Sequence, residues 1–205
     1  MVEKLLIFCL LAYFIGSIPF GIIVGRYIKG IDLQKEGSGN IGAANAFRVM
    51  GPVWGAIVLL GDFLKGVVSL MLAQHYFLVS VPPLFFILVG LFAILGHNYS
   101  IYLRFKGGKG VATTAGVFFF ISWKAALTAF SFWAVIIFFT GFASLGSLAA
   151  SLALPVCMLL FKEPFPYMIF AAAAFLLIVY THRSNIVRLL TGREKKLQFK
   201  KTVKS

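Results

Sequence analysis

Residues 37–48 form the stretch with the clearest chemical potential: Gly-Ser-Gly-Asn-Ile-Gly-Ala-Ala-Asn-Ala-Phe-Arg. Its glycines permit a tight turn whose amides can approach a ligand closely, and the run 43–47 favours a helix that directs its free N–H groups at that turn. Arg48 adds a planar fork of donors that suits a phosphate or a carboxylate. We therefore predict an anion site, with a plain glycine-rich turn between two helices as the alternative. Its predicted contributors are Gly37, Ser38, Gly39, Asn40, Asn45 and Arg48.

Two later stretches repeat this combination of glycine or small residues with basic, amide or imidazole groups. Residues 104–110 read Arg-Phe-Lys-Gly-Gly-Lys-Gly before a helical run from Val111, without the full spacing of a P-loop. Residues 181–188 read Thr-His-Arg-Ser-Asn-Ile-Val-Arg, and a small hydroxyl-bearing turn lies at 141–147. These stretches add the predicted phosphate-binding or catalytic residues Gly107, Gly108, Lys109, Gly110, Ser147, His182, Asn185 and Arg188.

The chemistry that these groups favour is the binding of one or two phosphates beside an apolar interior. No Cys-His or Ser-His-Asp arrangement is evident, and the six acidic residues are too few for a two-metal phosphatase. We therefore predict no metal and no cofactor. A transporter or channel for a phosphate-like anion is the alternative, because basic residues at one face and broken helices suit it. Against it, the clusters have no counterpart at the other face and no inverted repeat is visible.

The composition places these stretches in a membrane protein. Apolar residues make up 60% of the chain and charged residues only 12%, and the mean hydropathy is +0.96. A soluble domain of 205 residues cannot bury that much apolar surface. The net charge of +13 sits in clusters between and after apolar runs, which favours cytoplasmic loops and anionic lipid headgroups and not nucleic acid. Cys9 and Cys157 lie within apolar runs and are predicted to be packing residues.

The hydrophobic pattern predicts an all-α polytopic protein with seven transmembrane helices, some of them short or broken. The spans are predicted at 2–24, with a kink at 16–19, then 53–73, 83–102, 111–122, 125–140, from the 141–147 turn to Phe161, and 165–180. We treat 1–205 as one membrane domain, with a basic tail inside 183–205. Asp62 and Lys65 lie three residues apart in the second span and are predicted to form a structural ion pair, with a functional role as the alternative.

Seven spans put the termini on opposite sides, and the basic residues indicate which side is which. Fifteen of the nineteen Lys and Arg residues fall on one side, eight of them between Arg183 and Lys204. By the positive-inside bias, the C-terminus is predicted to be cytoplasmic and the N-terminus outside. All the glycine-basic stretches then lie at the cytoplasmic face.

The motifs also resemble those of the acyl-phosphate:glycerol-3-phosphate acyltransferase family (PlsY), in order and spacing, along nearly the whole chain. The matching segments are 16–21, 37–48, 61–66, 105–113, 144–147 and 182–189, with Gly192 and Glu194. The chain lacks the His-x-x-x-x-Asp pair of the other large group of glycerolipid acyltransferases. It departs from the resembled family at Ala44, where threonine is usual, and at Ser100, where proline is usual.

The resemblance implies transfer of a fatty acyl group from acyl phosphate to the 1-hydroxyl of glycerol 3-phosphate, giving lysophosphatidic acid and phosphate. This is the first step of bacterial phospholipid synthesis and implies a location in the bacterial inner membrane, with membrane lipids around the protein; the oligomeric state is not assigned. It implies that Ser38, Asn45 and Arg48, Gly107 to Lys109, and His182, Asn185 and Glu194 belong to three motifs of the site.

Within that reaction we expect Arg48 and Lys109 to bind phosphates. Ser38, Ser147 and the loop amides are expected to stabilise the anion that develops at the carbonyl. His182 and Asn185 are expected to orient the glycerol hydroxyl, Glu194 to pair with a basic neighbour, and His75 and His97 to have no catalytic role. The proton acceptor is either the departing phosphate, which we favour, or His182.

Overall fold

The computed structural model describes residues 2–76 and 81–197, and all regular elements in these ranges are helices. The described part of the basic tail therefore ends at residue 197, and the rest of that predicted tail lies outside the described residues. The α-helices are α1 Val2–Ser17, α2 Phe20–Ile22, α3 Ala43–Met50, α4 Pro52–Tyr76, α5 Pro83–Asn98, α6 Val111–Ile121, α7 Trp123–Thr140, α8 Ala143–Leu160, α9 Phe165–Thr181 and α10 Arg183–Leu190. A π-helix, Ile23–Ile28, follows α2, and a 3-10 turn, Ile101–Leu103, follows α5.

Five helical segments of the described chain are long and apolar enough to cross a membrane. They are Val2–Ile28, Pro52–Tyr76, Pro83–Leu103, Trp123–Thr140 and Ala143–Leu160. Helices α9 and α10 are long and apolar enough to cross a membrane only when they are counted together, and they meet at a bend of 64°. Helix α6 is apolar but has 11 residues, about half the length that a perpendicular span needs. The protein is thus an all-helical polytopic membrane protein, and a count of seven spans requires that both α6 and the bent pair cross.

The predicted break in the first span is present. Helix α1 ends at Ser17 and the chain resumes helical structure at Phe20, directly after Pro19. Proline has no N–H to donate and its ring crowds the preceding turn, so the helix cannot continue straight through it. After the break, Gly21 of α2 lies against the backbone of Ile41, in the loop that carries residues 37–42.

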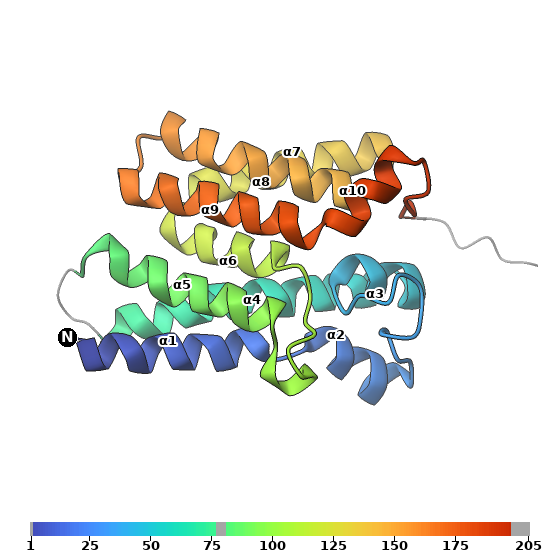
Figure 1. Cartoon of the computed structure of the whole chain (residues 1–205), viewed down its shortest axis with the longest axis horizontal. Helices are drawn as coiled ribbons and strands as arrows, with labels where there is room; N and C mark the ends of the chain where they lie inside the picture. Colours follow the sequence, from blue (N-terminus) through green and yellow to red (C-terminus); the bar gives the residue numbers. More distant parts are fainter. Residues whose placement is uncertain (1, 77–80, 198–205) are drawn as a thin grey trace, which may run out of the picture.

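The long helices lie roughly side by side (Figure 1), with α1 packed on α5, α4 on α6, and α8 on both α7 and α9. Their contact surfaces contain small buried residues such as Ala12, Ala93 and Ala171, which let neighbouring backbones approach closely. Large side chains fill the remaining space, among them the stacked rings of Phe118 and Phe170. This packing holds the helix ends in fixed positions.

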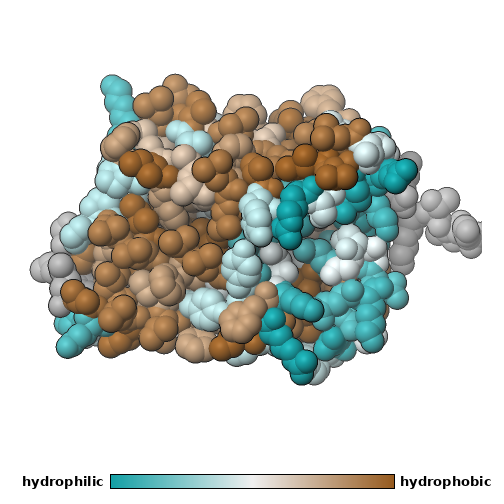
Figure 2. Space-filling view, in the orientation of Figure 1, coloured by the Kyte–Doolittle hydropathy of each residue, from teal (hydrophilic) through white to brown (hydrophobic). Residues whose placement is uncertain are grey.

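One end of the bundle gathers the polar residues. Figure 2 shows a brown apolar flank over the left and centre of the molecule and a teal hydrophilic region at the right. In Figure 1 that right end holds α3, α10 and the chain after α10, while residue 2 lies at the opposite end. The described chain therefore begins and stops at opposite ends of the bundle.

Candidate active site

A small polar cavity of about 110 Å³ lies at this end of the bundle, and all the predicted glycine-basic stretches contribute to its walls. Residues far apart in the sequence thus meet at one site, as the clustering of their chemistry predicts. Its polar lining includes Ser38, Asn40, Asn45, Arg48, Asp62, His97, Lys109, Ser144, Ser147, His182, Asn185 and Glu194.

Three helices begin at the cavity wall. Ala43, Val111 and Ala143 are the first residues of α3, α6 and α8, and each lines the cavity. The first N–H groups of an α-helix have no partner within the helix, and the helix dipole makes that end positive. The cavity therefore favours an anion before any side chain is considered.

An apolar groove of about 340 Å³ adjoins the polar cavity. The two share wall residues Leu59, Val111, Ala112, Trp133 and Ser147. From this junction the groove runs between α4, α6, α7 and α8, and its far wall includes Phe118, Phe119 and Phe130. A ligand with a charged head and a long apolar chain fits this pair of spaces.

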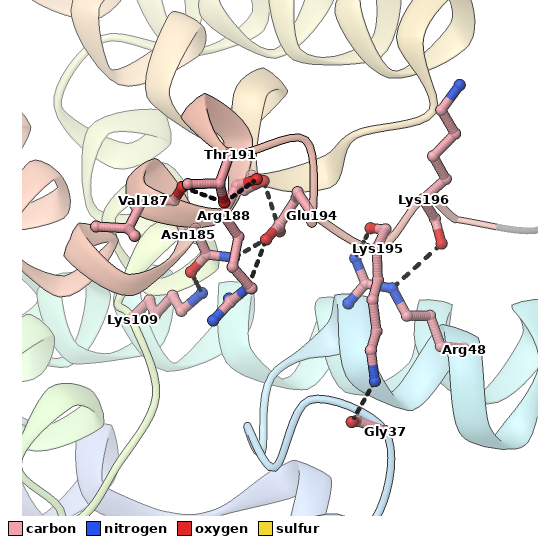
Figure 3. A network of polar contacts seen from close by, with 11 residues as sticks. Gly37, Arg48, Lys109, Asn185, Val187, Arg188, Thr191, Glu194, Lys195 and Lys196 are labelled. Carbon is pink, nitrogen blue, oxygen red and sulfur yellow. Dashed lines mark hydrogen bonds and ion pairs between the residues drawn. The ribbon is translucent and has the colours of Figure 1, made fainter.

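A network of polar contacts orders the cavity wall on the side of α10 (Figure 3). Lys109 donates a hydrogen bond to the Oδ1 atom of Asn185. The amide of Asn185 in turn donates to Glu194 Oε1 at 2.6 Å, and the Nε atom of Arg188 donates to Glu194 Oε2 at 2.7 Å. The Ser144 hydroxyl also donates to Glu194, at 2.8 Å. Glu194 therefore pairs with a basic neighbour, Arg188, which does not line the cavity, and it anchors Asn185 and Ser144, which do.

The electrostatics of the network follow from its burial. Burial lowers the pKa of Lys109 to about 8, although the carboxylate of Glu194 opposes this shift. Burial would raise the pKa of Glu194, but the hydrogen bonds from Asn185, Arg188 and Ser144 hold that pKa below its usual range. Lys109 is consequently a cation that gives up its proton more easily than an ordinary lysine, while Glu194 stays ionised.

The chain after α10 folds back against Arg48, Gly37 and Gly141. The prediction of a basic tail does not include these contacts. The guanidinium of Arg48 donates to the carbonyl oxygens of Lys195 at 2.7 Å and Lys196 at 3.4 Å (Figure 3). The ammonium of Lys195 donates to the carbonyl of Gly37 at 2.9 Å, and the amide of Leu197 donates to Gly141 at 2.8 Å. A guanidinium carries five N–H groups, so these contacts leave Arg48 with donors for a phosphate.

The first glycine stretch differs from the prediction at Asn45. Its side chain is 1% exposed, and its Oδ1 atom accepts the N–H of Ser38 at 2.8 Å. Its amide nitrogen donates to the carbonyls of Leu33 at 3.1 Å and Glu36 at 3.0 Å. These hydrogen bonds use the Asn45 side chain to hold the loop in place. The geometry therefore does not favour the predicted role of Asn45 as a direct ligand contact.

Gly107 and Gly108 also differ from the prediction that their amides reach a phosphate. The N–H of Gly107 donates to the carbonyl of Asn98 at 3.1 Å, and that of Gly108 donates to the carbonyl of His97 at 3.0 Å. A Cβ atom on Gly108 would lie 2.2 Å from Nε2 of His97. The glycines therefore let the loop lie directly against the end of α5, and this contact carries Lys109 into the cavity.

The hydroxyl of Ser147 and the imidazole of His182 are oriented by carbonyls of their own helical segments. The Ser147 hydroxyl donates to the carbonyl of Ala143 at 2.8 Å, so its proton is not directed at a ligand, in contrast to its predicted role at a carbonyl anion. The Nδ1 atom of His182 lies 2.9 Å from the carbonyl of Ile178. Because a carbonyl only accepts, Nδ1 carries the proton there, and the neutral ring keeps a lone pair on Nε2.

Asp62 and Lys65 form a buried ion pair at 2.7 Å, with side chains 4% and 3% exposed. His97 joins this pair, which the sequence does not predict. Its Nδ1 atom lies 2.9 Å from Nζ of Lys65 and 3.5 Å from Oδ1 of Asp62. Asp62 and His97 also line the polar cavity. His97 comes from α5, 32 residues beyond Lys65, and only the packing of the helices brings the two together.

We expect Asp62→Asn to lower the Tm in detergent by roughly 10 °C, because removal of one partner leaves the Lys65 charge buried and uncompensated. Thermal unfolding measures this shift. Asp32→Asn is the matched control, since the Arg26–Asp32 pair lies at the surface and is expected to contribute little. Equal Tm values for the two variants would contradict a structural role for the buried pair.

Comparison with known proteins decides the family. The family model for glycerol-3-phosphate acyltransferase matches residues 6–192. This chain belongs to the glycerol-3-phosphate acyltransferase family. The protein is accordingly an acyltransferase enzyme in a multi-pass membrane fold.

Relatives and solved structures agree with this placement. The chain is 45% identical to glycerol-3-phosphate acyltransferase 2 of Moorella thermoacetica, over 91% of this chain and 94% of that protein. It is 43% identical to the glycerol-3-phosphate acyltransferase of Thermotoga petrophila, over 93% and 95%. The fold superposes on the crystal structure of PlsY (YgiH), an integral membrane glycerol 3-phosphate acyltransferase, in its glycerol 3-phosphate form with a TM-score of 0.87 and 38% identity, covering 95% of this chain and 96% of that one. The lysophosphatidic acid form of PlsY gives a TM-score of 0.86.

Proposed function

We propose that this protein transfers a fatty acyl group from acyl phosphate to the 1-hydroxyl of glycerol 3-phosphate, giving lysophosphatidic acid and inorganic phosphate. The observation that carries the proposal is the junction of a polar cavity of about 110 Å³ with an apolar groove of about 340 Å³. Both substrates bear phosphates and one bears a long chain, which matches these two spaces. Solved relatives in glycerol 3-phosphate and lysophosphatidic acid forms support the same substrate and product.

In the proposed reaction, the glycerol oxygen forms a bond to the acyl carbon while the bond from that carbon to the phosphate oxygen breaks. The phosphate leaves with both electrons of that bond. Lys109, Arg48 and the helix N-termini hold the two phosphates close together, which supplies proximity and charge stabilisation. Asn185, which accepts from Lys109, is placed to orient the acceptor substrate.

The proton of the hydroxyl goes to the departing phosphate, whose second pKa of about 6 to 7 suits that role. The Nε2 lone pair of His182 is the competing acceptor. The Nδ1 bond to Ile178 holds the ring in the tautomer that could accept the proton, so variants of His182 that cannot take up a proton distinguish the two routes.

The proposal includes a membrane arrangement. In this arrangement the short α6 and the bent α9–α10 pair both cross, in addition to the five longer spans, and the excess of basic residues at one end orients the N-terminus outside and the C-terminus in the cytoplasm. The polar end with α3 and α10 then faces the cytoplasm of a bacterial cell, where glycerol 3-phosphate is dissolved, and the brown flank in Figure 2 faces lipid of the inner membrane. The groove gives the acyl chain access from that lipid phase.

The direct experiment mixes the purified protein in detergent with glycerol 3-phosphate and an acyl phosphate and follows release of phosphate and formation of lysophosphatidic acid. Both products should appear together, and only when both substrates are present. Absence of turnover, combined with phosphate flux when the protein is placed in liposomes, would favour an anion transporter in its place.

The pKa of Lys109 predicts how substrate binding depends on pH. Lys109 is a cation below about pH 8 and neutral above it, whereas the substrate phosphate is already doubly ionised above pH 7. We therefore expect the KM for glycerol 3-phosphate to rise as the pH increases through about 8, with a smaller change in kcat. Steady-state kinetics from pH 6.5 to 9.5 measure this, and a KM that stays flat over that range would remove Lys109 from phosphate binding.

A further inference from the structure

The chain after α10 links two groups of helices at the polar end of the bundle. Helix α3, which carries Arg48, packs on α4, whereas α10 packs on α8 and α9. Residues 194–197 contact both groups, since Arg48 and Ser144 of α8 each donate a hydrogen bond to this segment. Arg48 and Ser144 both line the polar cavity. The segment therefore ties one part of the cavity wall to another.

Both ends of this segment are fixed on the side of α8 and α10. The carboxylate of Glu194 accepts hydrogen bonds from Asn185 of α10 at 2.6 Å and from Ser144 of α8 at 2.8 Å. Three residues later, the amide of Leu197 donates to the carbonyl of Gly141, just before α8, at 2.8 Å. The two lysines between these anchors are consequently held in place from both ends.

These two lysines present their carbonyl oxygens to Arg48 (Figure 3). The guanidinium donates to the carbonyl of Lys195 at 2.7 Å and to that of Lys196 at 3.4 Å. An arginine side chain has many rotamers, and ordering it around a ligand costs conformational entropy. Acceptors that fix Arg48 before a phosphate binds reduce that cost.

The side chain of Lys195 adds a second link to the first glycine stretch. Its ammonium donates to the carbonyl of Gly37 at 2.9 Å. Lys195 therefore contacts the first and the last residue of the stretch 37–48, one through its side chain and the other through its backbone. Ser38, which follows Gly37, lines the polar cavity as Arg48 does. The position of Lys195 thus affects the placement of two cavity residues.

We propose that Lys195 is a positioning residue for phosphate binding: its ammonium ties the 194–197 segment to Gly37, and the segment holds Arg48 in the cavity wall. This inference rests on the proposed function, which supplies the phosphate that Arg48 binds. Lys195 acts through Arg48 and not by touching the substrate. Groups that hold their positions before both substrates arrive supply the proximity on which the transfer depends.

The test compares Lys195→Met, which removes the ammonium, with Lys195→Arg, which keeps a charged donor for Gly37. Steady-state kinetics of Arg48→Lys first show which phosphate substrate depends on the planar fork of Arg48. Lys195→Met should lower kcat/KM for that same substrate by about fivefold, mainly through a higher KM, because one hydrogen bond from an exposed lysine makes a modest contribution. Lys195→Arg should stay within about twofold of the wild type. Arg193→Met is the matched control, since it removes one positive charge from an exposed side chain nearby, and it should also stay within about twofold.

A double-mutant cycle shows whether Lys195 acts through Arg48. In the Arg48→Lys background, Lys195→Met should cost less than about twofold, because the guanidinium that the segment holds is already absent. The Tm of Lys195→Met in detergent should stay within about 2 °C of the wild type, since an exposed contact contributes little to stability.

Four results would overturn the inference in a wild-type protein that turns over acyl phosphate: normal kinetics of Lys195→Met or of Arg48→Lys, an equal loss in Arg193→Met, full additivity in the cycle, or a markedly lower Tm of Lys195→Met. A wild-type protein without turnover would instead overturn the proposed function, and this inference with it.

Discussion

Replacement of Lys109 by methionine is expected to lower kcat/KM for glycerol 3-phosphate by at least 100-fold, which corresponds to about 2.7 kcal/mol of transition-state stabilisation. Methionine fills similar space but cannot carry charge or donate a hydrogen bond. The half-buried Lys109 ammonium lies in the cavity wall and contacts Asn185, so a cation from solvent does not take its place. Steady-state kinetics with purified, folded protein measure the change.

Lys106→Met is the matched control for this prediction. Lys106 belongs to the same loop but is exposed, so its loss should change kcat/KM only slightly. The pH dependence of KM near pH 8 should also disappear in Lys109→Met and persist in Lys106→Met. Similar kinetics for both methionine variants would show that Lys109 is not part of the site.

Gly108→Ala is expected to lower kcat by about 100-fold, because a displacement of about 1 Å in a catalytic group can cost that much. The new methyl group would lie 2.2 Å from Nε2 of His97, with Cε1 and Cδ2 of the same ring at 3.0 and 3.1 Å. The loop must therefore move away from α5, and Lys109 moves with it. Kinetics and a thermal unfolding curve together separate misplacement from loss of the fold.

A double-mutant cycle tests whether the contact between the new methyl group and the His97 ring causes this loss of activity. The three contacts of the Gly108 methyl group all involve the His97 ring, so His97→Ala should restore part of the activity lost in Gly108→Ala. Gly107→Ala should not be rescued in this way, since its Cβ would meet the backbone oxygens of His97 at 2.0 Å and Asn98 at 2.7 Å. Strict additivity of Gly108→Ala and His97→Ala would show that the contact does not transmit the effect.

Much of the fold could be predicted because its signals are local. Apolar runs of about 20 residues predict spanning helices, and Pro19 predicts the break after Ser17. The helix after the first glycine stretch and the start of α6 at Val111 follow from the same kind of pattern. The count of spans could not be settled this way, because α6 is short and α9 bends into α10.

The candidate site could be predicted as a set of residues but not as a set of bonds. Local sequence indicates that Lys109, Asn185 and Arg48 suit phosphate, and the structure places all of them at one cavity. The local sequence carries no signal that Arg48 contacts Lys195, 147 residues away, or that His97 lies against the Asp62–Lys65 pair. Those contacts depend on how helix ends meet, which is a property of tertiary packing.

The roles of hydroxyl and amide groups were the hardest to predict for the same reason. Ser147 and Asn45 have suitable chemistry, yet their hydrogen-bonding groups are used within the fold. No motif distinguishes Thr113 from Thr114, yet among the described residues only the Thr113 hydroxyl has a hydrogen-bond partner. Which polar groups remain available to a substrate is therefore decided by the three-dimensional structure.

An oxygen label tests most directly whether the glycerol hydroxyl attacks the acyl carbon of an acyl phosphate at this cavity. The purified protein is given an acyl phosphate and glycerol 3-phosphate that carries ¹⁸O in its 1-hydroxyl, and both products are analysed by mass spectrometry. Attack by the glycerol hydroxyl on the acyl carbon leaves one ¹⁸O in the ester of the lysophosphatidic acid and none in the released phosphate. An ester without the label, or ¹⁸O in the phosphate, would contradict it.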